Sequence, residues 1–111
     1  MTIEENIDSS EDAVCIANNY GRILSANKRF CRLFGFDKEE VEWHYLCDLY
    51  RHLSEWNKCQ KSIPAPREKQ TMQARMRNRA GRSFPCILTR RVTKSAEGIP
   101  LLINSIQKVA A

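Results

Sequence analysis

The spacing of apolar residues changes along this chain of 111 residues, and the change limits the folds that it can adopt. Between residues 28 and 62, apolar side chains recur three and four positions apart, which is the period of a helix with one buried face. Further on, Met72, Ala74 and Met76 alternate with polar residues, which is the period of a strand with one buried face. The chain therefore combines helices and strands and is predicted to be an α+β protein.

Two short helices are predicted in the first third of the chain. A capping-box pattern that begins at Thr2 predicts an N-terminal cap helix over residues 1–11. Asn27 is a favourable N-cap for a second helix over residues 28–34, and Gly35 is a favourable residue to end it. Each helix is therefore predicted to begin at a residue that favours a helix start, and the second is also predicted to end at a glycine.

Two further helical segments are predicted in the middle of the chain. Asp37 is an N-cap for a short turn over residues 38–41. Residues 49–62 carry apolar side chains at helical spacing, and Pro64 lies just beyond them. We therefore expect one long helix to precede the strand-rich part of the chain.

Five strands are predicted around these helices. A hairpin is expected from residues 13–17 and 22–26, and three more strands are expected at residues 72–77, 84–89 and 99–109. The order is one helix, two strands, a run of helices and three strands. This order predicts a five-stranded antiparallel sheet with the short helices packed on one face.

Length and composition fit a single domain over residues 1–111, with a core at residues 12–109 after the cap helix. Hydrophobic residues make up 42% of the chain and charged residues 28%, which is too apolar for a disordered protein. No apolar run approaches the roughly 18 residues of a membrane helix, and the acidic N-terminus has no apolar signal segment. We expect a cytoplasmic protein that has no membrane partner.

The cysteines and histidines indicate neither a metal site nor an enzyme. The five cysteines are odd in number and contain no CxxC pair, so we expect them to be small buried side chains in a reducing compartment. GxSxG, P-loop and HExxH motifs are absent, and the two histidines lie too close along the chain for a dispersed catalytic triad. No catalytic residue and no metal ligand are predicted.

Four sequence motifs follow one another at characteristic separations. They are Asn18, Gly21, Ile23 and Asn27; the stretch Phe34–Val41; the stretch Arg79–Pro85; and the turn Gly98–Pro100. Together they resemble the pattern of the PAS (Per-Arnt-Sim) sensory domain over about residues 8 to 108. The resemblance implies a sensory or regulatory signal-transduction module, which works with an output domain or partner of the kinase, cyclase or transcription-regulator class.

The PAS resemblance also implies a space between the sheet and the helices that is either a ligand pocket or a packed core. The residues expected to line it are Leu46, Leu53 and Trp56 from the helices and Ile16, Ile23, Met72, Met76, Phe84, Leu88, Ile103 and Asn104 from the sheet. A pocket here would accept a small apolar metabolite. A packed core is the favoured interpretation, because apolar stripes at helical and strand periods are what any core produces.

The resemblance raises two cofactors, flavin and haem. Cys47 lies near the reactive position of flavin photosensors, but the flanking residues differ and Asn104 is the main amide on the last strands. His52 lies in a segment comparable to the one that carries the axial ligand of haem sensors, although Arg51 and Glu55 beside it indicate a solvent-facing position. We expect no cofactor, with haem on His52 as the alternative.

Charge is distributed unevenly along the chain, whose net charge is +5. Residues 1–12 carry five acids and no base, whereas residues 67–94 carry nine bases and one acid. The predicted basic patch comprises Arg75, Arg77, Arg79, Arg82, Arg90 and Arg91. Because few aromatic residues are free to stack on bases, we expect this patch to contact an acidic protein surface rather than nucleic acid.

Two mechanisms follow for a PAS-like module. In the first, Ile3 and Ile7 of the cap helix pack across the outer sheet face of a second copy, and the homodimer holds an output unit in a defined geometry. In the second, a small apolar metabolite binds between sheet and helices and shifts the terminal elements. Association is favoured because the sequence contains no ligand-specific set of residues. Nucleic-acid binding through the basic hairpin is a third hypothesis.

Overall fold

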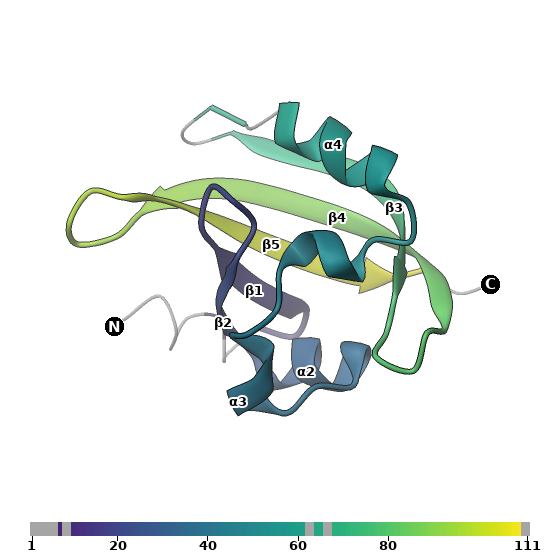
Figure 1. The fold of residues 1–111 in the computed structure, drawn as a ribbon. Coiled ribbons are helices and arrows are strands. Elements are labelled where there is room, and N and C mark those ends of the chain that lie inside the picture. The colour runs from purple at the N-terminus through teal and green to yellow at the C-terminus, as the bar shows by residue number, and fades with distance from the viewer. Residues whose placement is uncertain (1–6, 8–9, 62–63, 66–67, 110–111) are drawn as a thin grey trace.

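The computed structural model describes residues 7, 10–61, 64–65 and 68–109, and within them the chain forms one five-stranded sheet (Figure 1). Every neighbouring pair of strands is antiparallel, and the order across the sheet is β2-β1-β5-β4-β3. The strands are β1 (Ala13–Ala17), β2 (Ile23–Ala26), β3 (Lys69–Arg77), β4 (Ser83–Lys94) and β5 (Pro100–Lys108). The first and last strands of the chain thus lie side by side in the middle of the sheet.

The helical segments between residues 28 and 61 lie on one face of this sheet (Figure 1). They are α2 (Lys28–Phe34), α3 (Lys38–Val41), the 3-10 helix η1 (Leu46–Leu49) and α4 (Leu53–Lys61). Their buried side chains join those of the inner sheet face in one apolar cluster. The α+β fold expected from the sequence is confirmed, and none of the described helices has the length and apolar character needed to cross a membrane.

Helix α2 has the ends that its sequence predicts. The side chain of Asn27 accepts a hydrogen bond from the backbone N–H of Phe30 at 2.9 Å. Gly35 ends the helix with φ 79°, a left-handed conformation that glycine adopts without strain. Phe30 and Phe34 are completely buried, and their ring centroids lie 4.7 Å apart. A short helix is stabilised here by its caps and by two aromatic anchors.

The prediction of a single long helix over residues 49–62 is wrong. η1 ends at Leu49, and the next two residues pair with strand β3 instead of continuing a helix: Tyr50 forms a β-bridge with Met76, and the N–H of Arg51 donates to the carbonyl of Arg75 at 2.8 Å. Helix α4 then begins at Leu53 as a separate helix. Backbone pairing with the sheet edge has overridden the helical spacing of the side chains.

The two faces of the central strands hold different clusters. On the inner face Cys15 and Ala17 join the main core, whereas Val14 and Ile16 point to the outer face and form a second cluster with Ile7. The predicted cap helix lies almost wholly outside the described residues, as does Ile3, so this helix and its boundary with the core stay predictions. What the structure does describe is that Ile7 lies buried against the outer face of β1.

Candidate functional site

Most of the residues predicted to line the interior do face it. Those in or against the main core are Ile23, Leu46, Trp56, Met72, Met76, Phe84 and Leu88, and Asn104 is buried on the same face. All are buried except Met72, which is half-buried. These side chains contact one another and the aromatic residues of α2, so the described residues form a packed core here.

Three of the predicted lining residues lie elsewhere. Cys15 on β1 is the register partner of Asn104 on β5, and both side chains are buried toward the helices, so the adjacent partners Ile16 and Ile103 point to the outer face. Leu53, the first residue of α4, is 62% exposed. The prediction that these three residues face the interior is wrong.

A row of polar side chains crosses the inner face of the sheet within the apolar core. Gln70 pairs with Arg90, Arg90 pairs with Asn104, and Asn104 pairs with Cys15, so the row passes from β3 through β4 and β5 to β1. Arg90 and Asn104 are fully buried. Buried polar groups are costly unless they are hydrogen-bonded, so each of them needs a partner inside the fold.

Arg90 is not part of the basic surface, and its assignment to that patch is wrong. Its Nη1 donates to the carbonyl oxygen of Cys59 at 2.7 Å and to Oε1 of Gln70 at 3.2 Å. Cys59 lies in the last turn of α4, where carbonyl groups lack helical partners and a cation is favourable. The alternation of Phe84 and Leu88 in β4 places Arg90 on the same buried face, and this signal was present in the sequence.

Burial controls the chemistry of the thiols. Cys15 is completely buried, and burial raises the pKa of its thiol, with the hydrogen-bonding side chain of Asn104 opposing that rise. Burial also raises the pKa of Cys86 to about 11, and that of Cys47. No disulfide joins any of the five cysteines, and among the described residues no group of three or more acids, histidines or cysteines could hold a metal ion. Burial therefore favours the protonated form of the Cys15, Cys47 and Cys86 thiols.

His52 does not face the interior. It is exposed and immediately precedes α4, whereas Trp56 in the same segment is buried. An axial haem ligand has to reach iron between the sheet and the helices. The position of His52 therefore gives no support to the haem alternative.

The remaining arginines of the predicted basic patch do not form one surface. Nη1 of Arg79 forms an ion pair with Glu40 and donates to its two carboxylate oxygens at 2.9 Å and 2.8 Å. Nε of Arg77 donates to the carbonyl oxygen of Asp48 at 3.2 Å. Arg75 and Arg82 are exposed near the end of β5, whereas Arg91 lies on the outer face of β4. This dispersal removes the continuous basic stripe that a nucleic-acid backbone would require.

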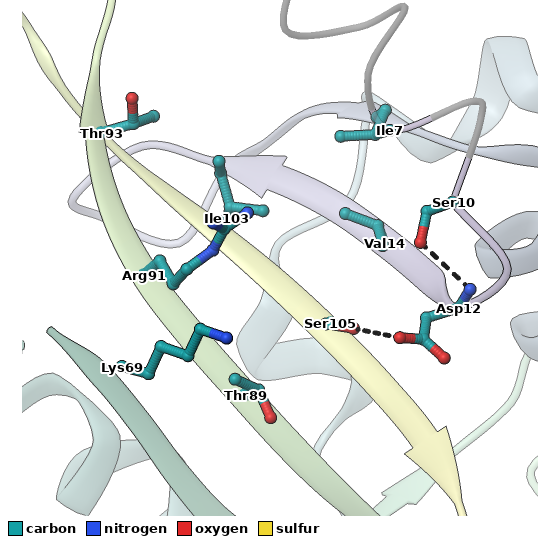
Figure 2. Close-up of a pocket in the computed structure, with 10 residues that line it drawn as sticks. All are labelled: Ile7, Ser10, Asp12, Val14, Lys69, Thr89, Arg91, Thr93, Ile103 and Ser105. Atoms are coloured by element: carbon teal, nitrogen blue, oxygen red, sulfur yellow. Dashed lines mark hydrogen bonds between the residues drawn. The ribbon is translucent and has the colours of Figure 1, made fainter. Parts of the chain in front are cut away.

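The outer sheet face carries a groove of about 540 Å³ (Figure 2). It is lined by Ile7, Ser10, Asp12, Val14, Lys69, Thr89, Arg91, Thr93, Ile103 and Ser105. Figure 2 shows Asp12 on one side of the groove next to Ser105, and Lys69 and Arg91 on the other side, with Ile103 beside Arg91. The sequence did not reveal this site, because its lining residues come from four segments of the chain that are far apart in sequence.

Asn27 fixes the wall of the groove that contains Ile7 and Asp12. Its Nδ2 donates to the carbonyl oxygens of Ile7 and Asp12, both at 2.8 Å, and its Oδ1 accepts from the N–H groups of Val14 and Phe30. The sequence predicted only the last of these bonds, the cap of α2. The other three attach the N-terminal segment to the sheet.

Comparisons with known proteins agree with this fold. A family model described as PAS domain matches residues 3–65, which is more than half of the chain. No curated protein matches the sequence.

Solved structures with low sequence identity share the fold. The PAS domain of an HTR-like protein from Haloarcula marismortui has a TM-score of 0.80 at 16% identity, covering 96% of this chain and 88% of that one. A PAS domain from Desulfitobacterium hafniense has a TM-score of 0.80 at 20% identity, covering 95% and 99%. The PAS domain of a LuxR-family regulator from Burkholderia thailandensis, solved in complex with ethanol, has a TM-score of 0.77 at 13% identity and covers both chains fully. The sheet with its one-sided helices and the match of the family model together show that the chain belongs to the PAS domain family of sensory signal-transduction modules.

Proposed function

We propose that this PAS domain is a non-enzymatic regulatory module that acts by association of two copies through the outer face of the sheet. The observation that carries the proposal is an apolar strip on that face, which we call the outer strip. It comprises Ile7, Val14, Ile16, Leu101 and Ile103. The proposal keeps residues 1–11 as an N-terminal cap segment and residues 12–109 as the core.

The outer strip is only partly covered within one chain. Ile7, Val14 and Ile16 are buried against one another, whereas Leu101 and Ile103 beside them are half-buried. Apolar side chains in a contiguous, partly exposed group on a sheet face are typical of a surface that contacts another protein. Since the helices occupy the opposite face, this is the face left for a second copy.

The module would pass its state to an output unit of the kinase or transcription-regulator class. Structures similar to this chain include a PAS domain from a two-component sensor histidine kinase and the LuxR-family regulator. Association at the outer strip would fix the relative position of two such units. The signal is then the geometry of the dimer rather than a reaction of this chain.

Sedimentation of the full chain tests the proposal. We expect a dimer that dissociates when Ile103 is replaced by Glu, and also when residues 1–10 are removed. Gln107→Glu is the matched control, because Gln107 lies on the same face of β5 but is exposed and outside the outer strip. A monomeric wild-type chain at high micromolar concentration would contradict the proposal.

A small-molecule receptor is the second candidate, and the buried polar row favours it. Arg90 and Asn104 place a cation and an amide inside an apolar core, where they could orient a polar group of a ligand. Mass spectrometry of protein purified under native conditions tests this function. A co-purifying molecule that Asn104→Leu removes would support the receptor, and a ligand-free spectrum with an unchanged fold would favour the association module.

A further inference from the structure

Two sulfur side chains meet between helix α4 and strand β3, which lies at the edge of the sheet (Figure 1). The thiol of Cys59 donates to Sδ of Met72 at 2.7 Å. Its Sγ also lies 3.4 Å from the phenol oxygen of Tyr50, in the segment between η1 and α4. Because Cys59 gives its single proton to Met72, the phenol is the donor in the second contact. We call Cys59, Met72 and Tyr50 the sulfur cluster.

The sulfur cluster is closed toward the core and accessible from the sheet edge. Cys59 and Tyr50 are 1% and 3% exposed, whereas Met72 is half-buried. A thiol is a weak donor and a thioether a weak acceptor, so their hydrogen bond is easily replaced. The side chain of Met72 is unbranched and has three rotatable bonds, so it can move aside. A small ion that enters beside Met72 therefore reaches both sulfur atoms.

The donor atoms of the sulfur cluster select among metal ions. Thiolate and thioether sulfur are soft ligands that favour Cu(I). A structural Zn²⁺ site needs four ligands from cysteine, histidine or carboxylate side chains. No group of even three such side chains occurs among the residues that the structure describes. One thiol, one thioether and one hydroxyl therefore suit a soft ion that accepts few ligands.

Arg90 limits the charge that the sulfur cluster can hold. Its Nη1 donates to the carbonyl oxygen of Cys59 at 2.7 Å, so a buried guanidinium group lies beside the cluster. Buried charge is costly unless it is compensated. The charges of Cu(I) and of the Cys59 thiolate add up to zero, whereas a divalent ion on one thiolate would leave a second positive charge near Arg90. A monovalent soft cation is the ion that both the ligands and the charge favour.

We infer that the sulfur cluster is a Cu(I) site, in which Sγ of Cys59 and Sδ of Met72 bind the ion and the hydroxyl of Tyr50 donates to the thiolate. Cu(I) takes the place of the thiol proton between the two sulfur atoms, and this proton is released to solvent. The sulfur atoms move apart as the ion enters, which the flexible side chain of Met72 allows. No electron is transferred. The bound ion joins α4 to β3, and the inference does not depend on the proposed association of two copies.

Competition with the Cu(I) chelator bathocuproine disulfonate, without oxygen and with a reductant, tests the inference in the full chain. We expect native mass spectrometry to show one Cu(I) per chain at an equimolar ratio. Cys59→Ser and Met72→Leu should each raise the Kd for Cu(I) by about a hundredfold or more, because the loss of a group that merely orients a metal ligand already weakens binding markedly. Zn²⁺ at the same concentration should not bind.

Cys47→Ser and Met76→Leu are the matched controls. Cys47 is half-buried, so it is the described cysteine most open to copper from solution. Met76 carries a thioether on the same strand as Met72 but is fully buried. Both controls should bind Cu(I) as the wild type does. Circular dichroism checks that each variant is folded.

Three results would overturn the inference. They are a wild-type chain that does not retain Cu(I) against the chelator, a Kd that neither Cys59→Ser nor Met72→Leu changes, and a loss in Cys47→Ser as large as that in Cys59→Ser. If a ligand variant does not fold, X-ray absorption of the copper-loaded wild type replaces it. Two sulfur neighbours of copper support the site, and nitrogen or oxygen neighbours alone overturn it.

Copper binding and dimerisation fail separately. Ile103 lies in the outer strip, on the face of the sheet opposite the helices. Ile103→Glu should therefore bind Cu(I) as tightly as the wild type, whatever its oligomeric state. A chain that dimerises without binding copper leaves the proposed function intact and overturns the copper site.

Discussion

The indole ring of Trp56 lies against the backbone of Gly21. A Cβ added to this glycine would lie 2.7 Å from Cζ2 of the ring and closer still to Cη2. Gly21 also has φ 85°, in the left-handed region that favours glycine. The contact joins α4 to the turn between β1 and β2, and it explains the glycine by space as well as by conformation.

Gly21→Ala should lower the free energy of unfolding by about 3 kcal/mol, since the methyl group must displace a buried tryptophan and the backbone is strained. Gly98→Ala is the matched control. Gly98 has φ 80° but nothing within 4 Å of an added Cβ, so its cost should be only about 1 kcal/mol. Urea unfolding measures both values, and equal losses would show that the Trp56 contact contributes nothing.

Asn27→Asp should destabilise the protein by about 2 kcal/mol or more. The new carboxylate can still accept from Val14 and Phe30, but it cannot donate to the carbonyl oxygens of Ile7 and Asp12. Faster hydrogen exchange at the amides of β1 should accompany the loss of stability.

Asn18→Asp is the control for that change. The side chain of Asn18 accepts from the N–H groups of Tyr20 and Arg22 through Oδ1, and an aspartate can accept both. We expect a change of no more than about 0.5 kcal/mol. A comparable loss in the two variants would mean that the donors of Asn27 are not the cause.

Arg90→Met should cost about 2 kcal/mol or more, because it leaves the carbonyl of Cys59 and the amide oxygen of Gln70 without their buried donor. Arg82→Met removes the same charge from an exposed position and should change stability by less than about 0.5 kcal/mol. Thermal and urea unfolding check the pair. An Arg90→Met protein as stable as Arg82→Met would show that α4 does not depend on this contact.

Stability should fall as the pH rises from 9 to 11. Burial raises the pKa of Cys86 from its ordinary value of 9.0 to about 11 and also raises that of Cys15, so the folded state keeps these thiols protonated while the unfolded state ionises. The unfolded state then binds fewer protons, and the free energy of unfolding decreases with pH over this range.

Cys86→Ala tests the assignment of this pH dependence. The variant should show a shallower fall between pH 9 and 11 than the wild type, because one of the thiols with a raised pKa has been removed. Urea unfolding at pH 8, 9, 10 and 11 gives the two curves. Parallel curves would exclude Cys86 as a source.

The sequence was sufficient wherever a local signal fixes local structure. Helix α2 begins and ends where its cap residues predicted, and β5 differs by one residue at each end from the expected strand. The sequence did not predict where α4 begins, because the pairing of Tyr50 with Met76 is a contact between distant segments. The sequence also did not predict which face of the sheet Ile16 occupies, because all five residues of β1 are buried and no alternation marks the inner face.

The hydrogen bonds of Asn27 have a mechanical consequence. The amide group that caps α2 also holds the carbonyl of Ile7 and the start of β1. A displacement of Ile7 would break a hydrogen bond at this amide, and the same amide caps the first turn of α2. The side chain of Asn27 thus connects the segment before β1 directly to the start of helix α2.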